Sequence, residues 1–123
     1  MARILLIEDE EISRYAVLQI LENAGHEVTE AENGNEGIAL QKAQPFDLIV
    51  TDIIMPEKEG VETIIELKRD YPTLPVIAIS GGGRTRNLDF LELAKRYGAD
   101  EVLAKPFSEE ELLECVNACL AKG

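Results

Sequence analysis

Short apolar runs alternate with longer amphipathic stretches along the whole chain. The runs are rich in leucine and β-branched residues, and they occupy positions 3–7, 27–29, 47–51, 76–79 and 101–103. Runs such as Ile4 to Ile7 lack polar alternation, which is typical of parallel strands covered by helices on both faces. The pattern therefore predicts five strands of one parallel sheet.

The stretches between these runs carry apolar residues at the spacing of one helix face. The clearest sets are Val17, Ile20, Leu21 and Ala24, and, near the C-terminus, Leu112, Val116 and Leu120. Gly25 marks the end of the first helix, and Ser108 with Glu111 predicts a capping box at the start of the last helix. Five βα units within 123 residues predict an α/β, flavodoxin-like (βα)5 doubly wound domain with a five-stranded parallel sheet in the order 2-1-3-4-5.

Composition narrows the classes of protein. Lys and Arg number 12 against 24 Asp and Glu, so the net charge is −12, and 46% of the residues are hydrophobic. We expect a single folded domain over residues 1–123 with no output domain. The excess of acids argues against direct nucleic-acid binding, because phosphate contacts need clustered cations.

Targeting and cysteine patterns point to the cytoplasm. No signal peptide precedes the first apolar run, and no run approaches the ~20 residues needed to span a bilayer, so we expect no membrane insertion. Cys115 and Cys119 lie four positions apart in a predicted helix. That spacing fits reduced thiols better than a disulfide framework or a zinc site.

Carboxylates gather at the predicted strand ends. Glu8 and Asp9 follow the first strand and Asp52 follows the third, so the three converge if those strands are neighbours. Like charges at close range favour protonation unless a cation lies among them. Oxygen donors without a nearby histidine or thiol suit Mg²⁺. Taken alone, Glu8 and Asp9 could instead cap the N-terminus of a helix.

A hydroxyl and an ammonium join the same edge. Ser80 ends the fourth strand before a run of three glycines, and the fifth strand ends near Lys105. A lysine offers a point charge to a phosphoryl oxygen and a serine offers a neutral hydrogen bond. Together with the acids they predict a site of the size of a phosphate group.

These residues carry a family resemblance. Glu8-Asp9, the stretch Asp52-Ile53-Ile54-Met55-Pro56 with Gly60, Ser80 and Lys105-Pro106-Phe107 resemble the receiver domain of bacterial two-component response regulators, which are CheY-like. The resemblance covers the whole chain. It implies that Asp52 accepts a phosphoryl group from a phosphohistidine.

The same resemblance implies the rest of the site. Mg²⁺ would be held by Glu8, Asp9, Asp52 and the main-chain carbonyl of Ile54, and the phosphoryl oxygens by Lys105 and Ser80. The implied partners are a sensor histidine kinase or a histidine phosphotransfer protein and a downstream effector protein. Whether the phosphorylated form becomes a homodimer is left open. The protein would not be an enzyme beyond its own phosphorylation at Asp52 and slow dephosphorylation.

Two positions depart from the family pattern. Val102 stands three residues before Lys105, where the family usually has an aromatic switch residue, and a β-branched side chain has no ring to rotate. Gly81 begins a triple glycine, so we expect output to depend on the ordering of residues 81–87. A local basic excess could form a partner surface with Ser80 and Val102 or could simply be solvated; it comprises Arg84, Arg86, Lys95 and Arg96.

The same residues are compatible with other functions to different degrees. As an alternative to a switch, the domain could relay phosphate to a phosphotransfer histidine or act as a phosphate sink. An aspartyl-phosphate phosphatase would need an acid two positions after Asp52, where Ile54 stands, and the glycine run does not complete a nucleotide-binding motif. His26, the only histidine, follows Gly25 and is expected to be a solvated turn residue rather than a phosphocarrier.

Overall fold

Strands and helices alternate from the N-terminus in the computed structural model, which describes residues 2–53, 59–80 and 87–122. The strands are β1 (Arg3–Ile7), β2 (Glu27–Ala31), β3 (Leu48–Ile53), β4 (Val76–Ser80) and β5 (Glu101–Ala104). The helices are α1 (Glu11–Asn23), α2 (Gly34–Ala43), α3 (Glu59–Asp70), α4 (Asn87–Arg96) and α5 (Glu109–Lys122). This order confirms the predicted succession of βα units.

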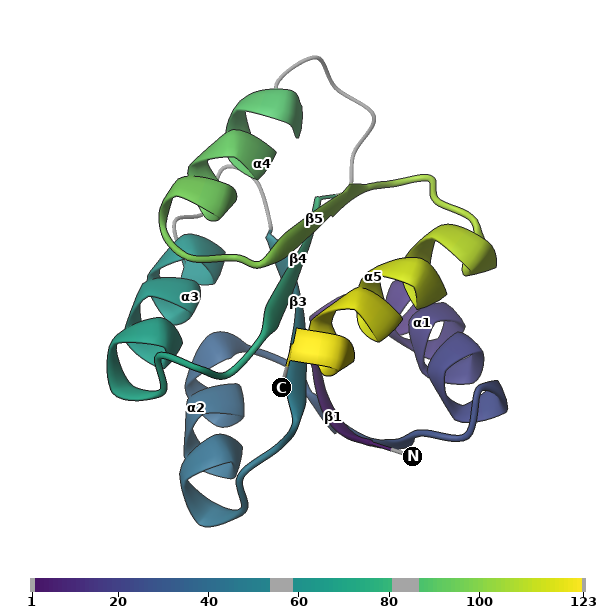
Figure 1. Ribbon diagram of the computed structural model, residues 1–123, viewed down its shortest axis with the longest axis horizontal. Coiled ribbons are helices and arrows are strands. Elements are labelled where there is room, and N and C mark those ends of the chain that lie inside the picture. Colours follow the sequence, from purple (N-terminus) through teal and green to yellow (C-terminus); the bar gives the residue numbers. More distant parts are fainter. Residues whose placement is uncertain (1, 54–58, 81–86, 123) are drawn as a thin grey trace.

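All strands belong to one parallel sheet in the order β2-β1-β3-β4-β5, as predicted (Figure 1). From β1 the chain moves outward to β2 and then returns to the other side of β1 to form β3. The carboxyl ends of β1 and β3 therefore flank the point where the strand order reverses. Ligands of doubly wound sheets bind at this point.

Helices cover both faces of the sheet. Figure 1 shows α1 and α5 on one face and α2, α3 and α4 on the other. Alternate residues of β1 belong to separate apolar clusters: Leu5 and Ile7 pack with the second group of helices, and Ile4 and Leu6 with the first. After Arg3, the residues of β1 are all apolar because both faces of the strand are buried there.

The third strand extends further than the apolar run predicted. Sequence reasoning ended it at Thr51, so that Asp52 followed the strand, but β3 continues to Ile53. Asp52 pairs with Ile79 of β4 and Ile53 pairs with Ser80. Asp52 is therefore fixed by the sheet rather than carried by a loop.

The ends of the helices match the predicted capping signals. Gly25 follows α1 with φ +94°, a conformation that favours glycine. The backbone N–H of Glu111 donates to Ser108 Oγ at 3.0 Å, and the Glu111 carboxylate accepts from the Ser108 N–H at 2.8 Å. This pair is the reciprocal capping box expected at the start of α5.

His26 differs from its expected solvated state. Its side chain is half-buried, and Nδ1 accepts a hydrogen bond from the backbone N–H of Ala2 at 3.2 Å. Burial lowers the pKa of this imidazole. His26 therefore helps to join the start of β1 to the α1–β2 turn.

Among the residues that the structure describes, every helix is too short or too polar to cross a membrane.

The capping box yields the first prediction. Ser108→Ala should lower the free energy of unfolding by about 1 kcal/mol, because the N–H of Glu111 loses its acceptor. Urea denaturation measures the change. Ser108→Thr keeps a hydroxyl acceptor and should remain close to the wild type; equal losses in the two variants would contradict a capping role.

Candidate functional site

Two adjacent strands position the acidic side chains. Glu8 continues β1, since its backbone N–H donates to the Ala31 carbonyl of β2 at 3.0 Å. Thr51 pairs with Ile7, so Asp52 lies beside Glu8 at the next step of the sheet. Side chains alternate between the faces of a strand, and Leu6 and Val50 both pack with α1 and α5. Glu8 and Asp52 therefore project from that same face.

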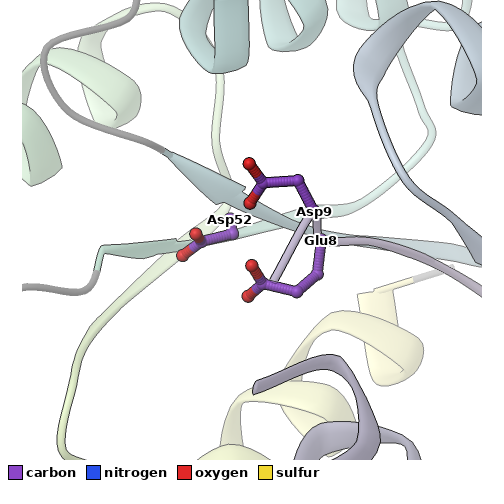
Figure 2. Close-up of side chains that lie close together, drawn as sticks. All are labelled: Glu8, Asp9 and Asp52. Carbon is purple, nitrogen blue, oxygen red and sulfur yellow. The ribbon is translucent and has the colours of Figure 1, made fainter. Parts of the chain in front are cut away.

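The three carboxylates converge as the sequence predicted. One oxygen from each of Glu8, Asp9 and Asp52 lies within 4.8 Å of the others, and the side chains point toward one another (Figure 2). Glu8 is only 3% exposed, the Asp52 side chain is 10% exposed, and Asp9 is exposed. The cluster is therefore buried on the side of Glu8 and open to solvent on the side of Asp9.

Lys105 supplies positive charge to this cluster. Its Nζ lies 3.2 Å from Glu8 Oε1 and 3.6 Å from Asp52 Oδ1. Glu8 also accepts a hydrogen bond from the backbone N–H of Glu10, through Oε2 at 3.1 Å. The buried charge of Glu8 is therefore paired, as burial requires.

Asp52 is less well compensated than Glu8. Within the described residues, its buried Oδ1 atom has no hydrogen-bond partner. The pKa of Asp52 is raised to about 7, mainly by burial and also by the Glu8 carboxylate, while Lys105 partly offsets the rise. A buried carboxylate oxygen beside an ammonium group but without a hydrogen bond is suited to bind a cation or to attack an electrophile.

The donor set fits Mg²⁺. Three carboxylates offer the hard oxygen ligands that this ion prefers, and the exposed side of the cluster leaves room for retained water. The Asp52 oxygen that lacks a hydrogen bond would gain a partner. The main-chain carbonyl of Ile54, the fourth predicted ligand, lies outside the described residues.

Ser80 lies on the strand that adjoins β3. It is fully buried at the end of β4, and its carbonyl accepts a hydrogen bond from the backbone N–H of Lys105 at 2.8 Å. Its partners in the sheet are Ile53 and Ala104. The structure thus places Ser80 on the strand beside Asp52, one register step further along.

The predicted partner surface is described in part. Val102 of β5 is half-buried and packs against the apolar cluster shared with α3 and α4. Lys95 and Arg96, at the end of α4, are exposed. Residues 81–86, which include Arg84, Arg86 and the glycine run, lie outside the described residues.

The first turns of α1 contribute contacts that sequence reasoning missed. Ser13 Oγ accepts a hydrogen bond from Lys105 Nζ at 3.1 Å. Arg14 donates to the Glu8 carbonyl at 2.8 Å and to Glu30 Oε1 at 3.0 Å, so it joins the β1–α1 connection to β2. A polar side chain near the start of a helix that follows Asp9 was the only signal available for Ser13, and it is weak.

Comparisons with known proteins agree with this geometry. Residues 4–117 match the response regulator receiver domain, so the chain belongs to this family of two-component signalling proteins. The chain is 37% identical to the protein PilH of Pseudomonas aeruginosa over 123 residues, which cover 98% of this chain and 99% of PilH. The resemblance read from the sequence is thereby confirmed.

The chain is also similar to other proteins, some of its own length and some about twice as long. Identity to the chemotaxis protein CheY of Halobacterium salinarum is 30% over 118 residues, with 96% of each chain covered. The crystal structure of the receiver domain of NtrX from Brucella abortus has a TM-score of 0.89 at 30% identity, covering 98% of this chain and 99% of that one. The chain spans about half (51%) of the transcriptional regulatory protein CpxR of Klebsiella pneumoniae.

The raised pKa of Asp52 predicts how stability depends on pH without metal. This carboxyl titrates near 3.8 when unfolded and at about 7 in the fold, so the native state binds more protons between these values. Stability should therefore fall as the pH rises through this window. Asp52→Asn removes the effect and should be more stable than the wild type at pH 8, on the order of a few kcal/mol because each pKa unit corresponds to about 1.4 kcal/mol, but nearly equal to it at pH 4.

Urea denaturation in EDTA from pH 4 to pH 8 measures this difference. Asp70→Asn is the matched control, because Asp70 is exposed and its pKa is lowered by a hydrogen bond from Arg69. This control should gain no stability at pH 8. A constant difference between Asp52→Asn and the wild type at all pH values would refute a raised pKa.

Proposed function

We propose that Asp52 is the phosphoacceptor of this receiver domain and that its phosphoryl group comes from a phosphohistidine. The donor would be a sensor histidine kinase or a histidine phosphotransfer protein. One observation carries the proposal: Asp52 Oδ1 is buried, has no hydrogen-bond partner among the described residues, and lies 3.6 Å from the Lys105 ammonium, beside two further carboxylates.

The proposed reaction exchanges one bond to phosphorus for another. A carboxylate oxygen of Asp52 attacks the phosphorus, a P–O bond forms, and the P–N bond to the donor imidazole breaks. The electron pair of that bond returns to the imidazole nitrogen, and the product on this chain is an acyl phosphate. Such a transfer depends mainly on alignment and on neutralising the phosphoryl oxygens.

The chain's own residues would supply both requirements. β3 fixes Asp52, because the residue pairs with β4. Lys105 brings a positive charge to the phosphoryl oxygens, and the Ser80 hydroxyl would donate a hydrogen bond to one of them. Mg²⁺ would be held by Glu8, Asp9, Asp52 and the carbonyl of Ile54, and when bound it would neutralise phosphoryl charge.

The output of the domain would be altered binding of a downstream effector protein. The surface proposed for this contact is made by β5 and the end of α4, with Val102, Lys95 and Arg96. Ser80 is fully buried and would influence this surface from the neighbouring strand. Arg84 and Arg86, which the sequence also assigns to it, lie outside the described residues. Since Val102 packs beneath α4 and has no ring, we propose that the change is carried by this region without an aromatic rotation. The domain would act in the cytoplasm and would catalyse no reaction beyond its own phosphorylation and slow dephosphorylation.

Labelling tests the phosphoacceptor. Acetyl phosphate or a cognate kinase in the presence of Mg²⁺ should label the wild type, and Asp52→Asn should reduce incorporation to background, because an amide cannot form the acyl phosphate. Intact mass spectrometry measures the stoichiometry. Asp70→Asn should label like the wild type, and labelling of Asp52→Asn at the wild-type stoichiometry would refute the proposal.

The phosphorylated protein also separates a switch from a relay. A switch should hold the acyl phosphate long enough to bind its effector more tightly than the unphosphorylated protein does. Rapid loss of phosphate to a phosphotransfer histidine, with unchanged effector binding, would replace the switch by a relay or a sink.

Magnesium binding gives an independent test of the acidic cluster. Millimolar MgCl₂ at neutral pH should raise the melting temperature of the wild type saturably, because the ion offsets repulsion among the three carboxylates. Asp9→Asn should weaken this response, and Asp70→Asn should retain it. An equal rise in both variants, or the same rise with NaCl of matched ionic strength, would indicate unspecific screening instead.

A further inference from the structure

The Lys105 ammonium has two hydrogen-bond partners among the described residues, besides its ion pair with Asp52. Its ammonium carries three N–H bonds, and it lies 3.1 Å from Ser13 Oγ and 3.2 Å from Glu8 Oε1. Asp52 Oδ1, at 3.6 Å, is beyond hydrogen-bond distance. Two of the three N–H bonds can therefore donate to Ser13 and Glu8, the two anchors of the ammonium, and the third is left for the direction of Asp52.

The Ser13 hydroxyl is itself oriented. Its O–H donates to Glu10 Oε1 at 2.6 Å, so its lone pairs are free to accept from the Lys105 ammonium. The chain of contacts runs from an ammonium through a hydroxyl to a carboxylate. A charged group stands at each end, and hydrogen bonds of this kind are the strong ones.

Glu10 braces both anchors of Lys105. Its side chain accepts from Ser13, and its backbone N–H donates to Glu8 Oε2 at 3.1 Å. Glu10 is also the N-cap residue of α1, yet its side chain makes no capping hydrogen bond. Short polar residues such as aspartate or serine ordinarily accept a backbone N–H of the first turn at this position; the longer glutamate carboxylate orients Ser13 instead.

We propose that Ser13 is a positioning residue, which holds the Lys105 ammonium so that its remaining N–H faces Asp52 and the incoming phosphoryl oxygen. The ammonium of a lysine lies at the end of a flexible four-carbon chain, so fixing it in one position costs conformational entropy. A second anchor on α1 restricts this freedom before the reaction, so less order must be created in the transition state. The proposal rests on the function proposed for Asp52 but concerns a different residue.

A matched pair of variants isolates the hydroxyl. Ser13→Thr keeps the oxygen and Ser13→Val removes it, while both are β-branched and of similar size at this half-buried position. The rate of phosphorylation by acetyl phosphate is measured against donor concentration at saturating Mg²⁺. The valine variant should have a maximal rate on the order of tenfold lower than the threonine variant, about 1.4 kcal/mol, with an unchanged half-saturating donor concentration.

Three outcomes would overturn the proposal. Equal rates in the two variants would show that the hydroxyl is not used. A faster valine variant would show that Ser13 draws Lys105 away from the phosphoryl group. A tenfold difference that persists when Lys105→Met is added to both variants would show that Ser13 acts through another group; we expect the difference to vanish in that background.

A measurement without phosphorylation separates this proposal from the function of Asp52. The ¹⁵Nζ resonance of Lys105 should be visible by NMR in the unphosphorylated wild type and in Ser13→Thr, because an anchored ammonium exchanges its protons slowly. It should broaden or disappear in Ser13→Val, and an identical resonance in the two variants would refute the anchoring. If Asp52 were not phosphorylated at all, the labelling experiment would fail while this difference remained.

Discussion

The repulsion among carboxylates at one edge of a parallel sheet is the constraint on which the site depends. Glu8 is buried and Asp52 is nearly so. Their carboxylate oxygens lie within 4.8 Å of each other, so their negative charges repel. Lys105 offsets only part of that repulsion, because it lies nearer to Glu8 than to Asp52. Asp52 is left with a raised pKa and with an oxygen that has no hydrogen-bond partner in the part of the chain that the structure describes, and these properties suit a group that binds a ligand or reacts.

The layout of the site could be predicted because it follows from the layout of the sheet. Strands that are buried on both faces have continuous apolar sequences, and the polar residues of the site lie at or just after the carboxyl ends of these strands. Once the strand order places β1 beside β3, Glu8 and Asp52 must be neighbours. The end of β3 was predicted too early because aspartate is disfavoured in strands, whereas pairing of Asp52 with Ile79 outweighs that preference.

The contacts of α1 could not be predicted in the same way. Whether Ser13 reaches Lys105 depends on the phase at which α1 begins and on the rotamers of two side chains, neither of which the apolar pattern specifies. The role of the Glu10 carboxylate could not be predicted either, since the contact depends on the rotamers of Glu10 and Ser13. His26 was expected to be solvated because it follows a turn, but Ala2 lies close enough to donate to it.

The Lys105 contacts join residues that lie 92 and 97 positions apart in the chain. Synthesis from the N-terminus delivers the acids first and their counter-charge only with the last strand. A partly made sheet thus exposes mutually repelling oxygens with no lysine among them, and it lacks the cation that would make Asp52 a competent nucleophile. The charge balance of the site is therefore reached only after the last strand has joined the sheet, late in the folding of the domain.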